Sequence, residues 1–73
     1  MVLADLKPGQ TAAIEAFENS PLVLKFLEIG LVPGAEVQLY ATAPLGDPIA
    51  VEVMGSKISL RKNEAKTIKI RLV

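Results

Sequence analysis

The chain has 73 residues, with no cysteine, no histidine and a formal net charge of zero. The missing thiols and imidazoles exclude disulfides and any metal or catalytic site that needs those groups. The balanced charge argues against strong non-specific attraction to nucleic acid or to an anionic membrane. A hydrophobic fraction of 51% is high enough for a globular core,. We expect one domain, residues 1–73, whose small core favours self-association or a lasting partner.

Residues Met1–Asp5 lack the basic start and long apolar run of a signal peptide,. No stretch approaches the ~18 to 20 consecutive apolar residues of a membrane span. The absence of cysteine fits a reducing compartment,. We therefore expect a cytoplasmic protein that does not insert directly into the membrane.

The first expected strand is Thr11–Glu18, where apolar and other residues alternate,. It follows Leu3 and Leu6, which are expected to anchor the N-terminus under the fold, and a turn signal at Lys7–Gly9. The alternation predicts an inward set, Ala12, Ile14 and Ala16, and an outward set, Ala13, Glu15 and Phe17.

A short helix is expected next. Asn19–Pro21 is a helix-start signal, with capping side chains followed by proline at the first helical position,. The helix should run from about Pro21 to Ile29 and end at Gly30, which can adopt a left-handed conformation. The residues expected on its core-facing side are Leu22, Phe26 and Ile29.

The remainder of the chain predicts four more short strands after a Pro33–Gly34 turn,. The expected strands span residues 35–43, 49–54, 57–60 and 67–72, with a loop at 44–48, a type II′ hairpin turn at Gly55–Ser56 and one helical turn at 61–66. Five short strands in so few residues favour a small closed or nearly closed barrel, because closure removes exposed strand edges. The alternation also places Ala41 and Leu72 on the buried side.

One cluster should hold the core. Its expected members are Ile14, Phe26, Ile29, Val37, Leu39, Ile49, Val51, Val53, Ile58, Leu60, Ile68 and Ile70. Val51 and Val53 should be buried on the strand where Glu52 points outward, since a shift by one residue would exchange the two faces.

The ordered pattern of residues resembles the FeoA family, small cytoplasmic proteins of bacterial ferrous iron transport. The resemblance is carried by Leu6–Gly9, Phe26–Val37 (FLEIGLVPGAEV), Pro44–Ile49, and the positions Val51, Val53, Gly55, Ile58, Leu60, Arg61, Glu64, Ala65 and Ile68. Two positions depart from it, because a leucine is usual at Phe26 and an arginine is common at Lys25. The resemblance implies a mainly β, SH3-like five-stranded barrel with one short α-helix between strands 1 and 2 and one helical turn before the last strand. It also implies a non-enzymatic partner of FeoB, a membrane transporter with a cytoplasmic GTP-binding domain.

The residues offer no catalytic, cofactor or metal site. There is no phosphate-binding glycine loop, and no serine has a base to activate it,. Ferrous iron usually needs imidazole or sulfur ligands in addition to carboxylates. The carboxylates are spread along the chain, at Asp5, Glu15, Glu18, Glu28, Glu36, Asp47, Glu52 and Glu64. We therefore expect a chain that is not an enzyme and holds no metal or cofactor.

A partner surface is the remaining candidate site. Leu24 and Leu27 lie away from the core-facing side of the helix, so they either form an apolar patch with Phe17 or Leu45, or are covered by the N-terminal leucines,. Lys25 belongs to the same candidate surface, although it lacks the guanidinium of an arginine. Leu45 either contacts a partner at a loop tip or covers the end of the barrel.

Two further interpretations concern charge. Asp47 either contacts a partner or, as we favour, accepts hydrogen bonds from nearby backbone N–H groups in a turn. From Lys57 onward the chain has six basic residues and one acid. This strip could bind nucleic acid, but aromatic residues are few, and cross-strand charge pairing is the simpler explanation.

We predict an accessory protein of ferrous iron transport that binds and modulates a FeoB-like transporter. The alternatives are a general SH3-like interaction module that acts as a homo-oligomer without an iron link and, third, a small nucleic-acid-binding barrel.

Overall fold

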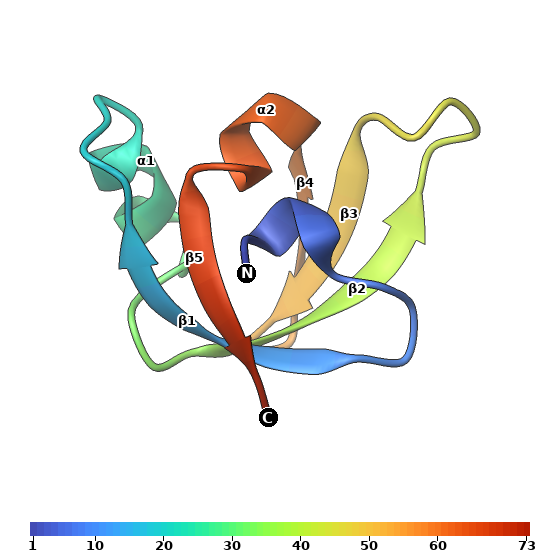
Figure 1. The fold of residues 1–73 in the computed structure, drawn as a ribbon, viewed down its shortest axis with the longest axis horizontal. Helices are drawn as coiled ribbons and strands as arrows, with labels where there is room; N and C mark the ends of the chain where they lie inside the picture. The colour runs from blue at the N-terminus through green and yellow to red at the C-terminus, as the bar shows by residue number, and fades with distance from the viewer.

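A computed structural model describes all 73 residues. Five antiparallel strands form one sheet in the order β4-β3-β2-β1-β5, which curls around a single core (Figure 1). The elements are the 3-10 helix η1 (Leu3–Asp5), β1 (Thr11–Phe17), α1 (Val23–Glu28), β2 (Glu36–Thr42), β3 (Ile49–Val53), β4 (Ser56–Leu60), α2 (Lys62–Ala65) and β5 (Ile68–Leu72). The predicted order of strands and helices is confirmed. The sheet is not closed, because β4 and β5 do not pair.

The core is one cluster of fourteen buried residues. Its members are Leu3, Leu6, Ala12, Ile14, Phe26, Leu31, Val37, Ile49, Val51, Val53, Leu60, Ala65, Ile68 and Ile70, with Leu39 and Ile58 partly buried against it. Val51 and Val53 are buried as predicted, so the register of β3 is confirmed. The expected anchoring by Leu3 and Leu6 is also confirmed: η1 packs against β5 and α2, beside the unclosed part of the barrel.

A β-bulge in β1 overturns part of the predicted alternation. The pairing of β1 with β5 shifts register between Ile14 and Ala16, so Glu15 is an extra residue and the faces exchange after it,. Ala16 is consequently exposed and Phe17 half-buried, the reverse of the prediction. Ala13 was predicted to point outward but is buried, since the longer side chains of its cross-strand neighbours flank it on both sides,.

A second β-bulge, in β2, interrupts the alternation of inward-facing and outward-facing residues in that strand. The register with β3 shifts between Leu39 and Ala41, which makes Tyr40 the extra residue,. Ala41 is therefore exposed, not buried as predicted. Leu72 was also predicted to be buried but is 47% exposed, at the last position of β5, where it pairs with Ala12.

The end of α1 explains a further correction. The Leu31 N–H donates to the Phe26 carbonyl at 2.9 Å and the Gly30 N–H to the Leu27 carbonyl at 3.3 Å, which is a Schellman motif with Gly30 at a positive φ of 98°,. This motif returns the chain to the core, so Leu31 is fully buried while Ile29 is 36% exposed. The expectation that Ile29 belongs to the core was wrong.

The start of α1 lies two residues later than predicted. The Ser20 hydroxyl accepts the Leu22 N–H at 3.1 Å, so Ser20 caps a turn through Pro21 and Leu22 that leads into the helix,. Only six residues, Val23–Glu28, are helical, and Phe26 is the one that is buried. A helix this short depends on tertiary packing for its stability.

The hairpin between β3 and β4 turns one residue earlier than predicted. Its central residues are Met54 and Gly55, with φ values of 51° and 81°, and they are flanked by the Val53–Ser56 pair. Positive φ at both positions defines a type I′ turn, one of the two turn types whose twist matches that of the flanking strands. The predicted Gly55–Ser56 turn of type II′ was therefore wrong.

Candidate functional site

The exposed side of α1 carries two leucines. Leu24 is 66% exposed and Leu27 39% exposed, while Phe26 between them is fully buried. At about 100° per residue, a helix that buries Phe26 must turn its neighbours at 24 and 27 away from the core. Leu3 and Leu6 lie in the core cluster, so the alternative in which they cover these leucines is wrong.

Phe17 packs against the buried side of α1. Its ring stacks on that of Phe26, with centroids 5.8 Å apart and an interplanar angle of 23°. Because Phe17 lies after the bulge of β1, it packs against the core instead of standing free as predicted. Phe17 is close to α1 and half-buried. Any partner contact it makes would therefore be at the edge of the surface formed by Leu24 and Leu27, called the leucine surface below.

Lys25 joins α1 to α2. Its ammonium Nζ lies 2.7 Å from Glu64 Oε2, in an ion pair and hydrogen bond. The other oxygen of Glu64 accepts the Arg61 N–H at 2.9 Å. The hydrogen bond from Lys25, followed by that from the Arg61 backbone, lowers the pKa of Glu64 below its ordinary value,. Lys25 is thus held in place next to the two leucines.

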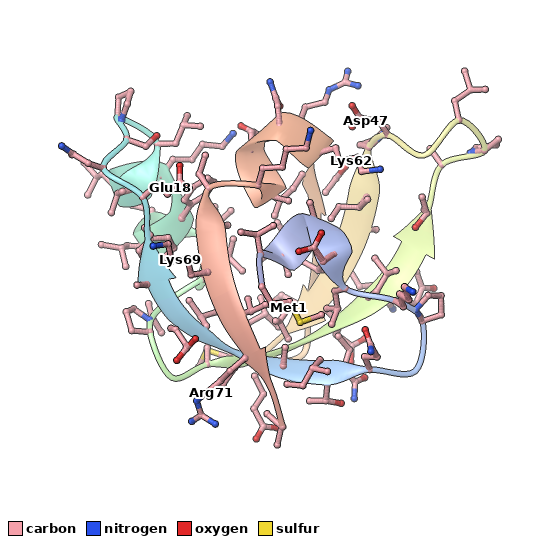
Figure 2. The ribbon with its side chains drawn as sticks, viewed as in Figure 1. Met1, Glu18, Asp47, Lys62, Lys69 and Arg71 are labelled. Carbon is pink, nitrogen blue, oxygen red and sulfur yellow. The ribbon has the colours of Figure 1, made fainter.

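Asp47 makes a contact over a longer range than predicted. Its Oδ1 accepts the backbone N–H of Lys62 at 3.0 Å, so the carboxylate binds the first residue of α2 and not its own turn. Figure 2 shows Asp47 and Lys62 side by side at the end of the barrel. This bond fastens the loop between β2 and β3 to α2.

Leu45 stands at the tip of that loop and is 98% exposed. It covers nothing, which rules out the interpretation that it closes the end of the barrel. Figure 1 shows α2 between this loop and α1, so the structure does not bring Leu45 into the leucine surface of α1. The sequence-predicted surface therefore divides into two places, Leu24, Lys25, Leu27 and Phe17 at α1, and Leu45 at the loop.

The basic residues of the last third also divide into two sets. Arg61, Lys62 and Lys66 lie on or beside α2, and Lys57, Lys69 and Arg71 lie on the strands. The predicted cross-strand ion pairs do not form. Lys57 is in register with Glu52, but its Nζ lies over the ring of Tyr40, 4.6 Å from the centroid. The single ion pair is Lys25–Glu64.

No three metal-ligating side chains gather anywhere in the structure, and the surface has no pocket. None of the helices has the length and apolar character needed to cross a membrane. Sequence reasoning missed two features of the site: the exposure of Ile29 beside Leu27, and the gathering of cations at α2. The exposure of Ile29 could have been predicted from Leu31, the apolar residue after Gly30. A Schellman motif at Gly30 turns the next residue toward the core, so that Leu31 and not Ile29 is buried.

The strand order, the helix after β1 and the helical turn before β5 define a small SH3-like β domain with an exposed apolar helix. The FeoA domain family matches residues 1–72. The chain belongs to the FeoA family, which is linked to ferrous iron transport.

Three relatives illustrate the likeness. The chain is 34% identical over its whole length to an Fe(2+) transport protein A/Fe(2+) transporter FeoB fusion protein of Porphyromonas gingivalis, of which it covers 9%. A solution structure of iron(II) transport protein A from Clostridium thermocellum has a TM-score of 0.94 and 42% identity, covering all of this chain and 46% of that one. FeoA of Stenotrophomonas maltophilia, described as a procaryotic SH3 domain protein complexed with zinc, has a TM-score of 0.84 and 30% identity, covering 97% and 89%.

Proposed function

We propose that this chain is a non-enzymatic accessory domain that binds a FeoB-like ferrous iron transporter and shifts the equilibrium between the transporter's states. The observation that carries the proposal is the relative in which an equivalent region and a FeoB transporter are parts of one protein. A fused domain acts on its neighbour at an effective concentration that can reach the millimolar range. Because fusion keeps the FeoA-like region and the transporter permanently close to each other, it supports a functional association between them.

The leucine surface of α1, formed by Leu24 and Leu27 with Ile29 beside them, is the proposed docking face. Three exposed aliphatic side chains on one short helix and its C-cap are the kind of apolar patch that marks interfaces,. Phe26 and the Lys25–Glu64 pair hold the helix in position from its other sides. The patch is therefore presented on a rigid support, which lowers the entropic cost of binding.

A binding role is favoured over catalysis by the chemistry of the chain. It has no thiol and no imidazole to serve as nucleophile or base,. The hydroxyl of Ser20 is engaged at the start of α1, where it accepts a backbone N–H. We place the protein on the cytoplasmic side of the membrane, where the GTP-binding domain of a FeoB-like transporter lies.

The same leucine surface could instead join two copies of the chain. In that case the protein would be a homo-oligomeric interaction module without a link to iron. Light scattering distinguishes the two, since a leucine surface reserved for the transporter leaves the free protein monomeric.

The decisive experiment is co-purification of the tagged chain with the FeoB-like transporter of the same cell, extracted in detergent. We expect the wild-type chain to retain the transporter and the Leu24→Ser/Leu27→Ser variant to lose it. Met54→Ser is the matched control, because Met54 is an exposed apolar residue on the β3–β4 hairpin and not on α1. Failure of the wild-type chain to retain the transporter, or equal retention by the double variant, would contradict the proposal.

A further inference from the structure

Although the protein is neutral overall, three of its cations without an ion pair lie close together on or beside α2. Arg61, Lys62 and Lys66 are all exposed, and none of them forms an ion pair. The Lys66 N–H donates to the Lys62 carbonyl at 3.1 Å, so these two residues are one helical turn apart and their side chains leave the same face,. Ala65 is the residue of α2 that points into the core, which leaves the cationic face turned to solvent.

The carboxylates on or beside α2 do not neutralise these cations by pairing with them. Each one accepts a hydrogen bond from a backbone N–H, and Glu64 also accepts one from Lys25. The bonds are Asp47 with the Lys62 N–H, Glu64 with Lys25 Nζ and the Arg61 N–H, and Asp5, on the adjacent η1, with the Val2 N–H. The guanidinium and ammonium groups of the three cations remain available to an anion outside the protein.

A nearly fully exposed leucine lies on the loop that is bonded to α2. Asp47 is bonded to the first residue of α2, and Leu45 lies only two residues before Asp47. Two residues of extended chain span about 7 Å at most. Leu45 therefore lies within two residues of the point where the β2–β3 loop is bonded to α2, and Figure 1 shows this loop and α2 at the same end of the barrel.

We infer that this surface, the α2 end, composed of Leu45, Arg61, Lys62 and Lys66, rests on an anionic lipid bilayer. Exposed lysines and arginines are attracted to the negative surface potential of anionic lipids. An exposed leucine flanked by such cations can enter the boundary between headgroups and acyl chains without spanning the membrane. The α2 end has no pocket for a single small anion, whereas an extended anionic surface can contact the three cations and the leucine together.

Other anionic occupants fit less well. Single-stranded nucleic acid is held by stacking its bases on aromatic side chains, and the α2 end has none,. Phe17 and Phe26 stack on each other, and Tyr40 lies under Lys57. The bilayer contact needs no transporter, so it goes beyond the proposed docking of α1 and can be tested without it.

The first test measures binding of the purified chain to sedimented vesicles. One set is made of phosphatidylcholine alone and the other of equal parts phosphatidylcholine and phosphatidylglycerol. We expect binding only to the anionic set, with a marked loss between low and physiological salt, because salt screens exposed charges. Replacing the three cations in an Arg61→Gln/Lys62→Gln/Lys66→Gln variant should weaken binding about fivefold per cation, on the order of 100-fold in all.

The matched control is Lys57→Gln/Lys69→Gln/Arg71→Gln, which removes the same charge from the strands. Lys57 lies at the far end of β4 from α2, and Figure 2 shows Arg71 at the opposite end of the barrel from Lys62. This variant should bind anionic vesicles much more tightly than the α2 variant does. Equal losses in both variants, or no binding of the wild-type chain to anionic vesicles, would overturn the inference.

A second test follows Leu45 itself. The chain has no tryptophan, so Leu45→Trp introduces a single fluorescent reporter at a site that packs against nothing. We expect its emission to shift to shorter wavelength with anionic vesicles and not with phosphatidylcholine. Met54→Trp, on the hairpin at the other end of β3, should show no shift. A shift at Met54 and none at Leu45 would mean that a different face meets the membrane.

Discussion

The ammonium of Lys25 lies 2.7 Å from Glu64 Oε2, and this contact links α1 to α2 across 39 positions of the chain. The two elements are short, with six and four residues, so neither is stable alone,. Glu64 also accepts the Arg61 N–H, one of the N–H groups left without a helical partner at the start of α2,. The Glu64 carboxylate therefore both links α1 to α2 and caps the start of α2.

Stability should depend on the ionisation of Glu64. Its pKa is lowered in the folded state, so its stabilising contribution is fully present above its ordinary value of 4.5 and disappears as the pH falls through the lower, folded-state pKa,. Glu64→Gln should destabilise the protein by about 0.5–1 kcal/mol at pH 7, in keeping with an ion pair whose lysine is exposed to solvent,. Urea denaturation at a series of pH values measures this. The difference between wild type and variant should vanish at strongly acidic pH, and a difference that stays constant would show that the charge of Glu64 is not the cause.

Phe26 and the flanking leucines should respond in opposite ways to substitution. Phe26 is fully buried, stacks on Phe17 and accepts the Leu31 N–H through its carbonyl. Phe26→Ala should cost roughly 3–5 kcal/mol, the usual loss for a buried aromatic side chain. Leu24→Ser/Leu27→Ser should cost no more than about 1 kcal/mol, mostly from helix propensity. Thermal unfolding of the variants compares them, and a double variant as unstable as Phe26→Ala would show that the leucines are structural.

Leu31 and Ile29 provide a second matched pair. The Schellman motif buries Leu31 and leaves Ile29 at the surface, although the two are separated by one residue,. Leu31→Ala should cost about 2–5 kcal/mol, as for other buried leucines, while Ile29→Ala should cost less than about 1 kcal/mol. Chemical denaturation of both variants tests this. The opposite ranking would mean that Ile29 and not Leu31 packs under the helix.

The strand pattern could be predicted from the sequence because Val51, Val53, Ile68 and Ile70 alternate with polar residues between clear turn signals,. The bulges could not, since the extra residues Glu15 and Tyr40 are ordinary strand residues and the register shift is decided by pairing with β5 and β3,. For the same reason Ala16 and Phe17 exchanged faces. Local pattern predicts which residues alternate, while pairing decides where the alternation is interrupted.

The candidate site likewise has some features that the sequence predicts and others that it does not. The exposure of Leu24 and Leu27 followed from their angular distance to Phe26 within one helix,. The ion pair between Lys25 and Glu64 joins residues far apart in the sequence, and no local signal indicates it. The hydrogen bond of Asp47 to Lys62 is equally remote and replaced the local turn that the sequence favoured.

The hydrogen bond that the Lys62 N–H donates to Asp47 should protect the start of α2. In the Asp47→Ala variant this N–H loses its acceptor, so we expect a loss of about 0.5–2 kcal/mol, comparable to removing a helix cap,. Amide hydrogen exchange of Lys62 should accelerate in this variant. Asp47→Asn keeps an oxygen acceptor and should retain most of the protection. Unchanged exchange in Asp47→Ala would show that the bond does not hold the loop to α2.

Nucleic acid should not bind at physiological salt. The six basic residues from Lys57 onward are divided between the strands and α2, so they form no continuous track for a phosphate backbone. The aromatic rings that could stack on bases are engaged within the chain, as Phe17 on Phe26 and Tyr40 under Lys57,. Fluorescence anisotropy with labelled single-stranded RNA and duplex DNA measures this at low and physiological salt. A complex of low-micromolar affinity at physiological salt that weakens steeply with further salt would show that phosphate contacts dominate, and would place nucleic acid ahead of protein and lipid as the partner.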